Sequence, residues 1–409
     1  MKKIITIIGI NYYPEDTAIG LYTSQLSNFY NDIGVEVNVI TAFPYYPSWR
    51  INSDYKLKKT FFYENINGIH VYRYKQFVPK NPTFLKRILH LIDFSFGTFI
   101  NIFKIKKTDA IICIVPFIGS VFVGKILSIM KRAKLWIHIQ DFEIDAVSDS
   151  NIVGNKTSKN FIFKLLFNVE KNLLNSADLL STISSSMIIK LQNKLTIKKE
   201  MKLLPNWVDV DLIKKEDYTT HKYLTSSKFK ILYSGNIGEK QDWDFFIKFV
   251  KELECHDDIE IIVVGNGSKR IWLEEKSLDF NNIYFYNPVE YSELSDLLCS
   301  ADLHILFQKL DVIDTVMPSK ILAMMSSEKP SLISGNLKSE VSTIINNSKA
   351  GKYFDTDSIN NILDFVYQIK SDKLLQLNYG KNARKFVIEN YSKTKILNQF
   401  NDNFLNLIK

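Results

Sequence analysis

The hydrophobic positions of this chain alternate between two periods, which predict strands and helices in turn. Short apolar runs predict buried strands of a parallel sheet, because both faces of such strands are covered. Apolar residues recur at helical spacing over 21–33, and Gly34 stands where a helix C-cap is expected. The region up to residue 41 therefore predicts one βαβ unit. In the first half the predicted strands lie at residues 3–8, 35–41, 69–74, 109–115, 135–139 and 178–181.

The same rhythm restarts in the second half of the chain. The polar and charged stretch 206–228 is where we place the connection between two domains. The predicted fold class is α/β, with two Rossmann-like domains that face each other across a cleft. The predicted domains are residues 1–205 and 206–390, followed by an amphipathic helix at 391–409 that crosses back to the first domain. In the second half strands are predicted at 229–232, 259–264, 283–286, 303–307 and 331–333, and helices at 243–254, 269–278, 291–300 and 319–327.

The apolar start of the chain is predicted as the first strand rather than a signal peptide. It ends at Asn11 to Glu15 without a small-residue cleavage site. No segment offers ~20 uninterrupted apolar residues, so no transmembrane helix is predicted. The three cysteines show no C-x-x-C spacing, which argues against a disulfide framework or a zinc site. Free thiols in a reducing cytoplasm are the expectation.

Composition limits the class of partner. The chain has 409 residues, enough for two domains that each bury a core. It carries 52 basic and 44 acidic side chains, and its formal charge of +8 suits an anionic small molecule or an anionic membrane surface. No zinc knuckle, helix-turn-helix signature or arginine-rich tract supports a nucleic-acid partner, so none is predicted.

The stretch Tyr233-Ser-Gly-Asn-Ile-Gly-Glu-Lys-Gln241 joins a predicted strand to a predicted helix. Glycine lets the backbone approach an anion, the N–H groups of a first helical turn point at it, and Lys240 adds a full positive charge. The pattern therefore predicts a phosphate site. Alone it is unspecific, because it contains neither the G-x-x-x-x-G-K-[ST] nor the G-x-G-x-x-G pattern.

Residues 85–107 are unusually apolar and aromatic, with basic residues at both ends. Two interpretations stay open for this segment. It forms either a crossover helix packed on the sheet, or an amphipathic helix on an anionic membrane with Lys104, Lys106 and Lys107 at the headgroups.

A series of short motifs in one order resembles a known family. The motifs are Gly9-Ile-Asn-Tyr-Tyr-Pro-Glu15 with Ile19-Gly20, Ile40-Thr-Ala-Phe-Pro-Tyr-Tyr-Pro47, His138-Ile-Gln-Asp-Phe-Glu-Ile-Asp145, Ser181-Thr-Ile-Ser184, Pro205-Asn-Trp207, residues 232–241, Val264-Gly-Asn-Gly267 and Met317-Pro-Ser-Lys320. On these residues the chain resembles the retaining GT-B glycosyltransferases of glycosyltransferase family four. Within them it is similar to the bacterial colanic acid and O-antigen branch, which is fucosyltransferase-like. The similarity spans nearly the whole chain.

The resemblance implies transfer of a sugar from a nucleotide diphosphate sugar to a hydroxyl, with retention and without a metal or another cofactor. It implies that the second domain holds the donor and the first domain the acceptor. The expected partners are the nucleotide sugar, a polyprenyl-diphosphate-linked saccharide and an anionic membrane, with the protein cytoplasmic and peripheral to the inner membrane. GDP-L-fucose is the favoured donor and a UDP-sugar the next. The product would belong to a surface polysaccharide such as O-antigen, capsule or colanic acid.

The resemblance also implies roles for residues of the second domain. Lys240 is expected to stabilise the departing diphosphate, because a fixed ammonium is worth most where charge develops in the transition state. A solvated lysine at a helix start is the plain alternative. Relatives often carry two glutamates where this chain has Thr315 and Ala323. The other expected donor-binding residues are Asn236, Gly238, Gly265, Asn266, Gly267, Val289, Pro318, Ser319 and Lys320.

In the first domain, Gly20 is expected to begin a helix whose amides approach the donor phosphate or the acceptor. His138 and Asp141 are candidate catalytic residues, and Glu143 and Asp145 are candidate acceptor ligands. A core histidine is an equal alternative for His138. A retaining front-face mechanism needs no dedicated base, so this cluster would supply a general base only in an inverting enzyme.

Two other functions stay open. An enzyme like the UDP-N-acetylglucosamine 2-epimerases shares the two-domain architecture but needs no acceptor. A nucleotide-sugar-binding protein that has lost catalysis would explain the missing glutamates.

Overall fold

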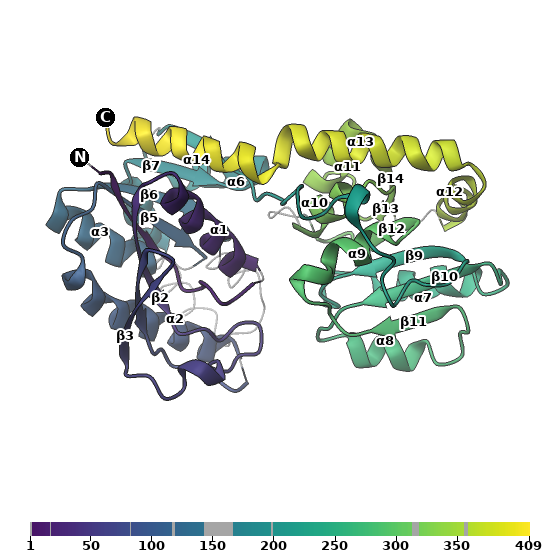
Figure 1. Ribbon diagram of the computed structural model, residues 1–409, viewed down its shortest axis with the longest axis horizontal. Coiled ribbons are helices and arrows are strands. Elements are labelled where there is room, and N and C mark those ends of the chain that lie inside the picture. Colours follow the sequence, from purple (N-terminus) through teal and green to yellow (C-terminus); the bar gives the residue numbers. More distant parts are fainter. Residues whose placement is uncertain are drawn as a thin grey trace. The chain divides into compact units, whose positions relative to one another are not determined.

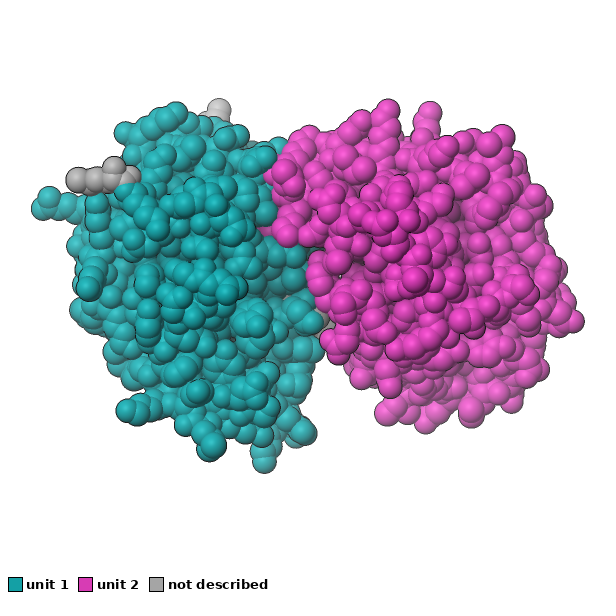
Figure 2. Space-filling view, viewed as in Figure 1, with its two compact units in different colours: residues 1–205, 397–409 teal, residues 206–396 magenta. Residues whose placement is uncertain are grey.

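The computed structural model describes residues 2–16, 18–81, 83–116, 119–142, 167–197, 199–312, 319–355 and 359–409. The chain divides into two compact units, Met1–Pro205 with Leu397–Lys409, and Asn206–Ile396 (Figure 1, Figure 2). Each unit is built on one sheet of mainly parallel strands with helices packed on it. The predicted α/β fold class with two Rossmann-like halves is therefore confirmed.

An eight-stranded sheet forms the centre of the first unit. Its strands are β1 (Ile4–Ile8), β2 (Glu36–Ala42), β3 (Phe61–Ile66), β4 (Ile69–Tyr74), β5 (Ala110–Val115), β6 (Lys134–Ile139), β7 (Leu179–Thr182) and β8 (Met201–Leu203). The described helices of this unit are α1 (Ala18–Asp32), α2 (Phe84–Phe99), α3 (Gly119–Lys131) and α6 (Ser185–Lys194), with short 3₁₀ segments η1 (Ser53–Tyr55) and η2 (Ile100–Lys104). The C-terminal helix α14 (Lys393–Leu407) joins them through residues 397–407.

The order of this sheet is β3-β4-β2-β1-β5-β6-β7-β8, and only the β3–β4 pair is antiparallel. The central strands are continuous apolar runs, and every residue of β5 is buried. The chain adds strands on one side of β1 and then, from β5 on, on the other side. The switch point of this doubly wound sheet therefore lies between β1 and β5, where such sheets bind ligands at their carboxyl edge.

Helix α14 packs on the first sheet through aromatic side chains. The Phe400 ring lies 5.4 Å from that of Trp136 in β6, and the Phe404 ring lies 5.4 Å from that of Tyr30 in α1. All four side chains are buried. The end of the chain is thus part of the core of the first unit.

The second unit holds a six-stranded, fully parallel sheet of order β11-β10-β9-β12-β13-β14. Its strands are β9 (Phe229–Ser234), β10 (Ile259–Val264), β11 (Ile283–Tyr286), β12 (Leu303–Phe307), β13 (Ser331–Ser334) and β14 (Gly351–Phe354). Its described helices are α7 (Trp243–Glu252), α8 (Arg270–Lys276), α9 (Leu294–Cys299), α10 (Ser319–Ser326), α11 (Glu340–Ser348), α12 (Ile359–Ser371) and α13 (Lys373–Tyr391), with η3 (Lys215–Asp217) and η4 (Tyr291–Glu293).

Helix α7 shows why the turn before it is well defined. Asp242 caps the helix, since its side chain accepts a hydrogen bond from the N–H of Phe245 at 3.0 Å. The buried face of the helix carries Trp243, Phe246 and Phe249, which join the core of the second unit. The turn therefore lies between two elements, β9 and α7, that both pack into the core of the second unit.

Helix α1 begins earlier than the sequence pattern predicts. Gly20 is its third residue rather than its start, and Gly34 follows the helix with φ of +83°. A β-carbon on Gly20 would lie 2.8 Å from Cβ of Glu15, so glycine is needed there for close packing against the preceding loop.

Candidate functional site

The carboxyl ends of the strands of the second sheet lie along one edge, because the strands are parallel. Three segments that follow these ends carry glycine turns or basic residues. They are the turn 235–241 between β9 and α7, the turn 265–269 between β10 and α8, and the start of α10. The carboxyl edge of a parallel sheet is the usual place for a ligand.

The turn after β9 is held by its own side chains. Gln241 accepts a hydrogen bond from the N–H of Gly238 at 3.1 Å, and the indole of Trp243 donates to the Gly238 carbonyl at 2.8 Å. The predicted use of the Gly238 amide for a ligand therefore competes with an internal bond. Within the described part of the chain, the N–H groups of Asn236 and Lys240 donate no hydrogen bond, which leaves them available to an anion.

The turns after β9 and β10 touch through their backbones. The N–H of Gly235 donates to Val264 at 2.9 Å, and the N–H of Ile237 donates to Asn266 at 2.9 Å. A β-carbon on Gly265 would overlap the carbonyl oxygen of Gly235. Glycine is required at this position because the two turns form one surface.

Lys320, in the first turn of α10, reaches the turn after β9. Its Nζ donates to the hydroxyl of Tyr233 at 3.0 Å and lies 4.7 Å from the centre of that ring. The hydroxyl of Tyr233 donates in turn to the carbonyl of Asn236 at 2.6 Å. Gly235 has φ of +137°, and a β-carbon there would lie 3.1 Å from Lys320 Nζ. The structure thus brings Lys320 and the turn after β9 together.

Burial raises the pKa of Tyr233 well above its usual range, so the phenol stays neutral and donates. Tyr233 therefore connects the ammonium of Lys320 to the backbone of the turn. Sequence reasoning missed this role, although Tyr233 begins the stretch 233–241 from which the phosphate site was predicted. The only sequence signal was an aromatic residue near the carboxyl end of a buried strand.

Lys240 lies in the same turn with an exposed side chain. Its carbonyl accepts a hydrogen bond from the N–H of Lys309 at 3.1 Å, which fixes the backbone. Its side chain forms no ion pair within the described residues, whereas neighbouring Glu239 pairs with Lys269 at 3.2 Å. Lys240 therefore presents an exposed positive charge on a fixed turn.

Arg270 is a second residue that sequence reasoning missed. Its Nη1 donates to the carbonyls of Gly265 at 2.7 Å and Tyr286 at 2.8 Å, and its Nε pairs with Glu274 at 2.6 Å. The guanidinium thereby ties the turn after β10 to the end of β11. Its position at the start of a helix, directly after a glycine turn, was the available signal.

The structure describes all but one of the remaining predicted donor residues of the second domain. Asn266 and Gly267 lie in the turn after β10, where the Asn266 side chain accepts from the Gly267 N–H at 2.8 Å. Val289, after β11, is partly buried against the core, and Ser319 is the first residue of α10. Pro318 in the second domain and Glu143 and Asp145 in the first lie outside the described residues.

His138 lies inside the first unit, in β6. Its Nδ1 is 2.9 Å from the hydroxyl of Ser181, its Nε2 is 3.0 Å from the amide of Gln140, and its ring packs 5.1 Å from that of Phe400. Burial lowers its pKa to about 3. This environment favours the alternative of a core histidine, because both ring nitrogens are occupied by the protein. Asp141, two residues past β6, is partly exposed and accepts from the N–H of Phe142 at 2.7 Å.

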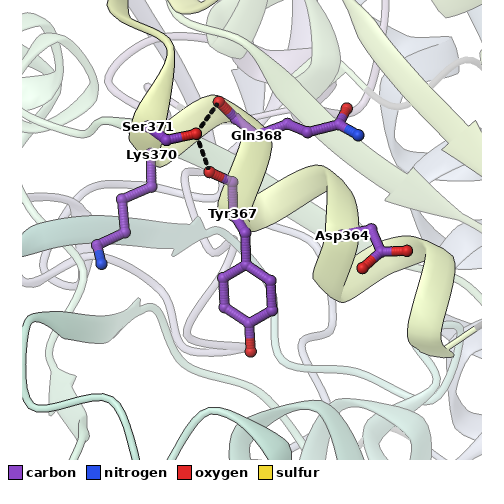
Figure 3. A pocket seen from close by; sticks show the side chains of 5 residues that line it. All are labelled: Asp364, Tyr367, Gln368, Lys370 and Ser371. Atoms are coloured by element: carbon purple, nitrogen blue, oxygen red, sulfur yellow. Dashed lines mark hydrogen bonds between the residues drawn. The ribbon is translucent and has the colours of Figure 1, made fainter.

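A surface hollow on α12 does not belong to this site. Figure 3 shows its lining by Asp364, Tyr367, Gln368, Lys370 and Ser371, all from that helix. Tyr367 hydrogen-bonds His256 at 2.9 Å, and Lys370 pairs with Asp258. Both partners directly precede β10, so the hollow lies at the amino edge of the sheet, away from the turns.

Within the described ranges, no group of three or more potential metal ligands is present. No helix among these residues is long and apolar enough to cross a bilayer.

Comparisons with known proteins relate this arrangement to other chains. The family model described as glycosyl transferases group 1 matches residues 216–386, which contain all three converging segments. The protein named "Putative colanic acid biosynthesis glycosyl transferase WcaI" from Escherichia coli (strain K12) is 30% identical over 413 residues, covering 97% of this chain and 98% of its own.

Two solved structures share the fold of both units. Sucrose-phosphate synthase from Thermosynechococcus elongatus matches with a TM-score of 0.73 at 14% identity, over 99% of each chain. HepE of Anabaena, in complex with UDP-glucose, matches with a TM-score of 0.66 at 14% identity, over 98% of this chain and 99% of its own.

Proposed function

The chain belongs to the group 1 glycosyltransferases, and on that premise we propose that it moves a sugar from a nucleotide diphosphate sugar to a hydroxyl of a lipid-linked oligosaccharide. The proposed setting is surface polysaccharide assembly, which the similarity to WcaI supports. The observation that carries the proposal is the cluster formed by the turn 235–241, the turn 265–269 and Lys320. We propose that the second unit holds the donor and the first unit the acceptor.

In the proposed reaction, the bond between the anomeric carbon and the diphosphate oxygen breaks, and the acceptor oxygen bonds to that carbon. The diphosphate leaves with the electron pair and gains negative charge. Lys240 and Lys320 stabilise this charge, together with the amides of Asn236 and Lys240 and the helix dipole at the start of α10. We propose retention, with a leaving phosphate oxygen taking the acceptor proton and no metal needed.

The described geometry leaves His138 out of the proposed catalytic set. Asp141 stays a proposed catalytic residue, and Glu143 and Asp145 stay proposed acceptor-side residues. Arg270 and Tyr233 act as positioning residues, because they hold the turns and Lys320 rather than the substrate.

The donor proposal keeps GDP-L-fucose first and a UDP-sugar second. Thermal-shift measurements with GDP and UDP would separate the two, because a ligand that binds only the folded state raises apparent stability according to its affinity. A shift with UDP alone would replace the GDP-L-fucose proposal.

The residue assignment is tested by the variants Lys240→Ala and Lys320→Ala. Each removes a cation that faces developing charge, so we expect turnover to fall by roughly 100-fold with smaller changes in donor KM. Lys248→Ala is the matched control, since Lys248 is exposed on α7 outside the turn. Near-normal turnover of either site variant would remove that lysine from the mechanism.

We also propose that the protein is cytoplasmic and contacts the inner membrane peripherally through α2, η2 and α3. An exposed apolar stripe runs along α2 and η2 at helical spacing, and its residues are 40% to 74% exposed: Leu89, Ile92, Phe96, Ile100 and Phe103. On the opposite face of α2, Leu91 and Phe94 are buried. Helix α3 packs beside α2 and adds exposed Phe122, Ile129 and Met130.

Three exposed lysines lie at the end of the stripe, Lys104, Lys106 and Lys107. Lys104 also donates to Asn101 at 2.9 Å and lies over the Phe61 ring. The crossover-helix interpretation and the membrane interpretation are thus compatible, because one face of the segment packs inward while the other is exposed.

The double variant Phe96→Ser and Phe103→Ser tests the stripe. We expect it to lose most co-sedimentation with anionic liposomes, because two exposed aromatic anchors are removed. Leu278→Ser is the control, since that side chain is 81% exposed on the second unit. Unchanged co-sedimentation of the double variant would exclude this surface.

A further inference from the structure

A cavity of about 220 Å³ lies in the first unit, at the carboxyl edge of its sheet. Its lining comes from segments that follow three neighbouring strands. Asn11 follows β1, Tyr45 and Trp49 follow β2, and Pro116 follows β5. Arg87 and His90 of α2 complete the wall. The cavity therefore lies at the switch point between β1 and β5, where a doubly wound sheet binds its ligand.

The wall is aromatic and tightly arranged. The ring of Tyr45 lies 4.6 Å from that of His90 and 5.4 Å from that of Trp49, in both cases edge to face. The guanidinium of Arg87 lies 5.1 Å over the Trp49 ring. Trp49 has φ of +51°, an unfavourable backbone conformation for a bulky residue. Such conformations concentrate at ligand sites, where the surrounding structure maintains them.

His90 gives the wall a polar group without a partner. Its Nδ1 hydrogen-bonds the carbonyl of Phe77, which only accepts, so Nδ1 carries the hydrogen. Nε2 is then an acceptor in the neutral ring, and it is buried without a hydrogen-bond partner in the described structure. An unsatisfied buried acceptor destabilises a fold unless a ligand hydroxyl or water completes it.

The two loops that form the wall are tied together by one buried carboxylate. Glu15 is 5% exposed, and its Oε1 accepts from the N–H groups of Tyr45 at 2.7 Å and Tyr46 at 2.8 Å. Its Oε2 accepts from the Asn11 side chain at 2.8 Å. Glu15 is therefore a positioning residue that fixes the segment after β1 against the segment after β2.

We infer that this cavity binds one pyranose ring, the sugar of the acceptor, with Trp49 and Tyr45 against its apolar face. This inference rests on the proposed glycosyl transfer. The volume is below the ~300–1,000 Å³ of drug-sized sites and suits one ring rather than a nucleotide sugar. Aromatic faces bind the C–H face of a sugar, while His90 Nε2 offers an acceptor to one of its hydroxyls. An alkyl chain would leave this buried acceptor unpaired.

The test measures sugar binding directly on the intact chain. Saturation-transfer NMR with methyl α-L-fucopyranoside, methyl β-D-galactopyranoside and methyl α-D-mannopyranoside should show ring-proton signals for at least one glycoside. Trp49→Asn removes the ring and keeps a residue that tolerates positive φ, and it should abolish these signals. Trp49→Phe should retain part of them. Tyr63→Ala, at an exposed aromatic residue of β3 outside the cavity lining, should leave them unchanged.

Acceptor kinetics supply the second measurement. Trp49→Asn should raise the acceptor KM by at least about tenfold, corresponding to the loss of one good contact, while the thermal shift induced by nucleotide is retained. Unchanged NMR signals and acceptor KM in Trp49→Asn would overturn the inference, even if transfer itself is demonstrated. Signals from farnesol but from none of the glycosides would assign the cavity to lipid instead. Glycoside binding that depends on Trp49, without any transfer, would contradict the proposed function but would still support a sugar-binding cavity.

Discussion

At the scale of single residues, the candidate donor site depends on how Lys320 is held. An unrestrained lysine loses considerable side-chain entropy when it binds a ligand. Here the hydroxyl of Tyr233 accepts from Lys320 Nζ and donates to the Asn236 carbonyl, so the ammonium is already placed beside the turn. Preorganised charge of this kind stabilises a transition state without further rearrangement.

Tyr233→Phe tests this positioning. The variant keeps the ring and removes the hydroxyl, leaving Lys320 without one acceptor and Asn236 without one donor. We expect turnover to fall by roughly tenfold and the free energy of unfolding by about 1 kcal/mol. Tyr284→Phe, at an exposed position of β11, is the control. Full activity of Tyr233→Phe would show that Lys320 needs no such support.

The buried histidine of the first unit gives a prediction about pH. The folded pKa of His138 is about 3 because of burial, against 6.5 for the ordinary side chain. Below pH 6.5 the unfolded chain binds a proton that the folded chain does not, so stability is lost as pH falls towards 3. The loss for this one group is about 1.4 kcal/mol per pH unit.

Denaturation by guanidinium at pH 7.5 and pH 5.0 measures the effect. Between these values, wild type should lose about 2 kcal/mol more stability than His138→Gln, which has no titrating group at this position. His70→Gln, at a partly buried position of β4, is the matched control. Equal pH dependence of wild type and His138→Gln would contradict the neutral core assignment.

At the scale of elements, the site is a product of backbone contact between two strand-to-helix turns. The prediction from this contact concerns Gly265→Ala, whose new β-carbon would overlap the carbonyl oxygen of Gly235. The turns must separate, so we expect the thermal shift with nucleotide to be lost and stability to fall by roughly 3 kcal/mol.

Gly34→Ala is the control for this substitution. Gly34 also has positive φ, +83°, but nothing lies within 4 Å of an added β-carbon. Gly34→Ala should lower the free energy of unfolding by about 1 kcal/mol through backbone strain alone, and it should leave nucleotide binding intact. If Gly265→Ala behaved like Gly34→Ala, the two turns would not act as one surface.

Most elements could be predicted from the sequence because their apolar period is clear, as in β5 and β10, where every residue is buried. Strand β3 was missed because it is an edge strand without a buried residue, so it lacks the continuous apolar run of the central strands. Its hairpin to β4 did carry a local signal, Asn67-Gly68, with φ of +51° and +93°. Asn-Gly is the strongest short-range hairpin signal, so this hairpin was predictable from the local sequence.

The candidate site was predictable only in part, for a physical reason. Glycine turns and lysines are visible in sequence, so Lys240, Lys320 and the turn 265–269 could be named. Contacts such as Lys320 with Tyr233 join residues far apart in the chain, and they depend on the strand order. For His138 the sequence left a catalytic and a core role equally open, because its burial under Phe400 depends on the returning C-terminal helix.

At the scale of the whole molecule, the last helix contributes to the core of the first unit. Phe400 is fully buried against Trp136 and His138. Phe400→Ala should therefore cost about 3–5 kcal/mol through the cavity that it leaves. Differential scanning calorimetry should show destabilisation, while GDP or UDP still shifts the second unit if nucleotide binds there.

Leu374→Ala is the comparison for this whole-molecule prediction. Leu374 is 69% exposed on α13, so its loss should change the melting temperature little. A Phe400→Ala chain as stable as Leu374→Ala would mean that α14 is not part of the first core.

Donor-dependent transfer tests the central claim most directly. Wild type, Lys320→Ala and Lys248→Ala are incubated with radiolabelled GDP-L-fucose or a UDP-sugar and a polyprenyl-diphosphate-linked saccharide, and the lipid product is analysed by chromatography. We predict label in the lipid fraction and release of nucleoside diphosphate with wild type and Lys248→Ala, and roughly 100-fold less with Lys320→Ala. Conversion of the nucleotide sugar into an epimer without acceptor, or nucleotide binding with no transfer to any acceptor, would contradict the account.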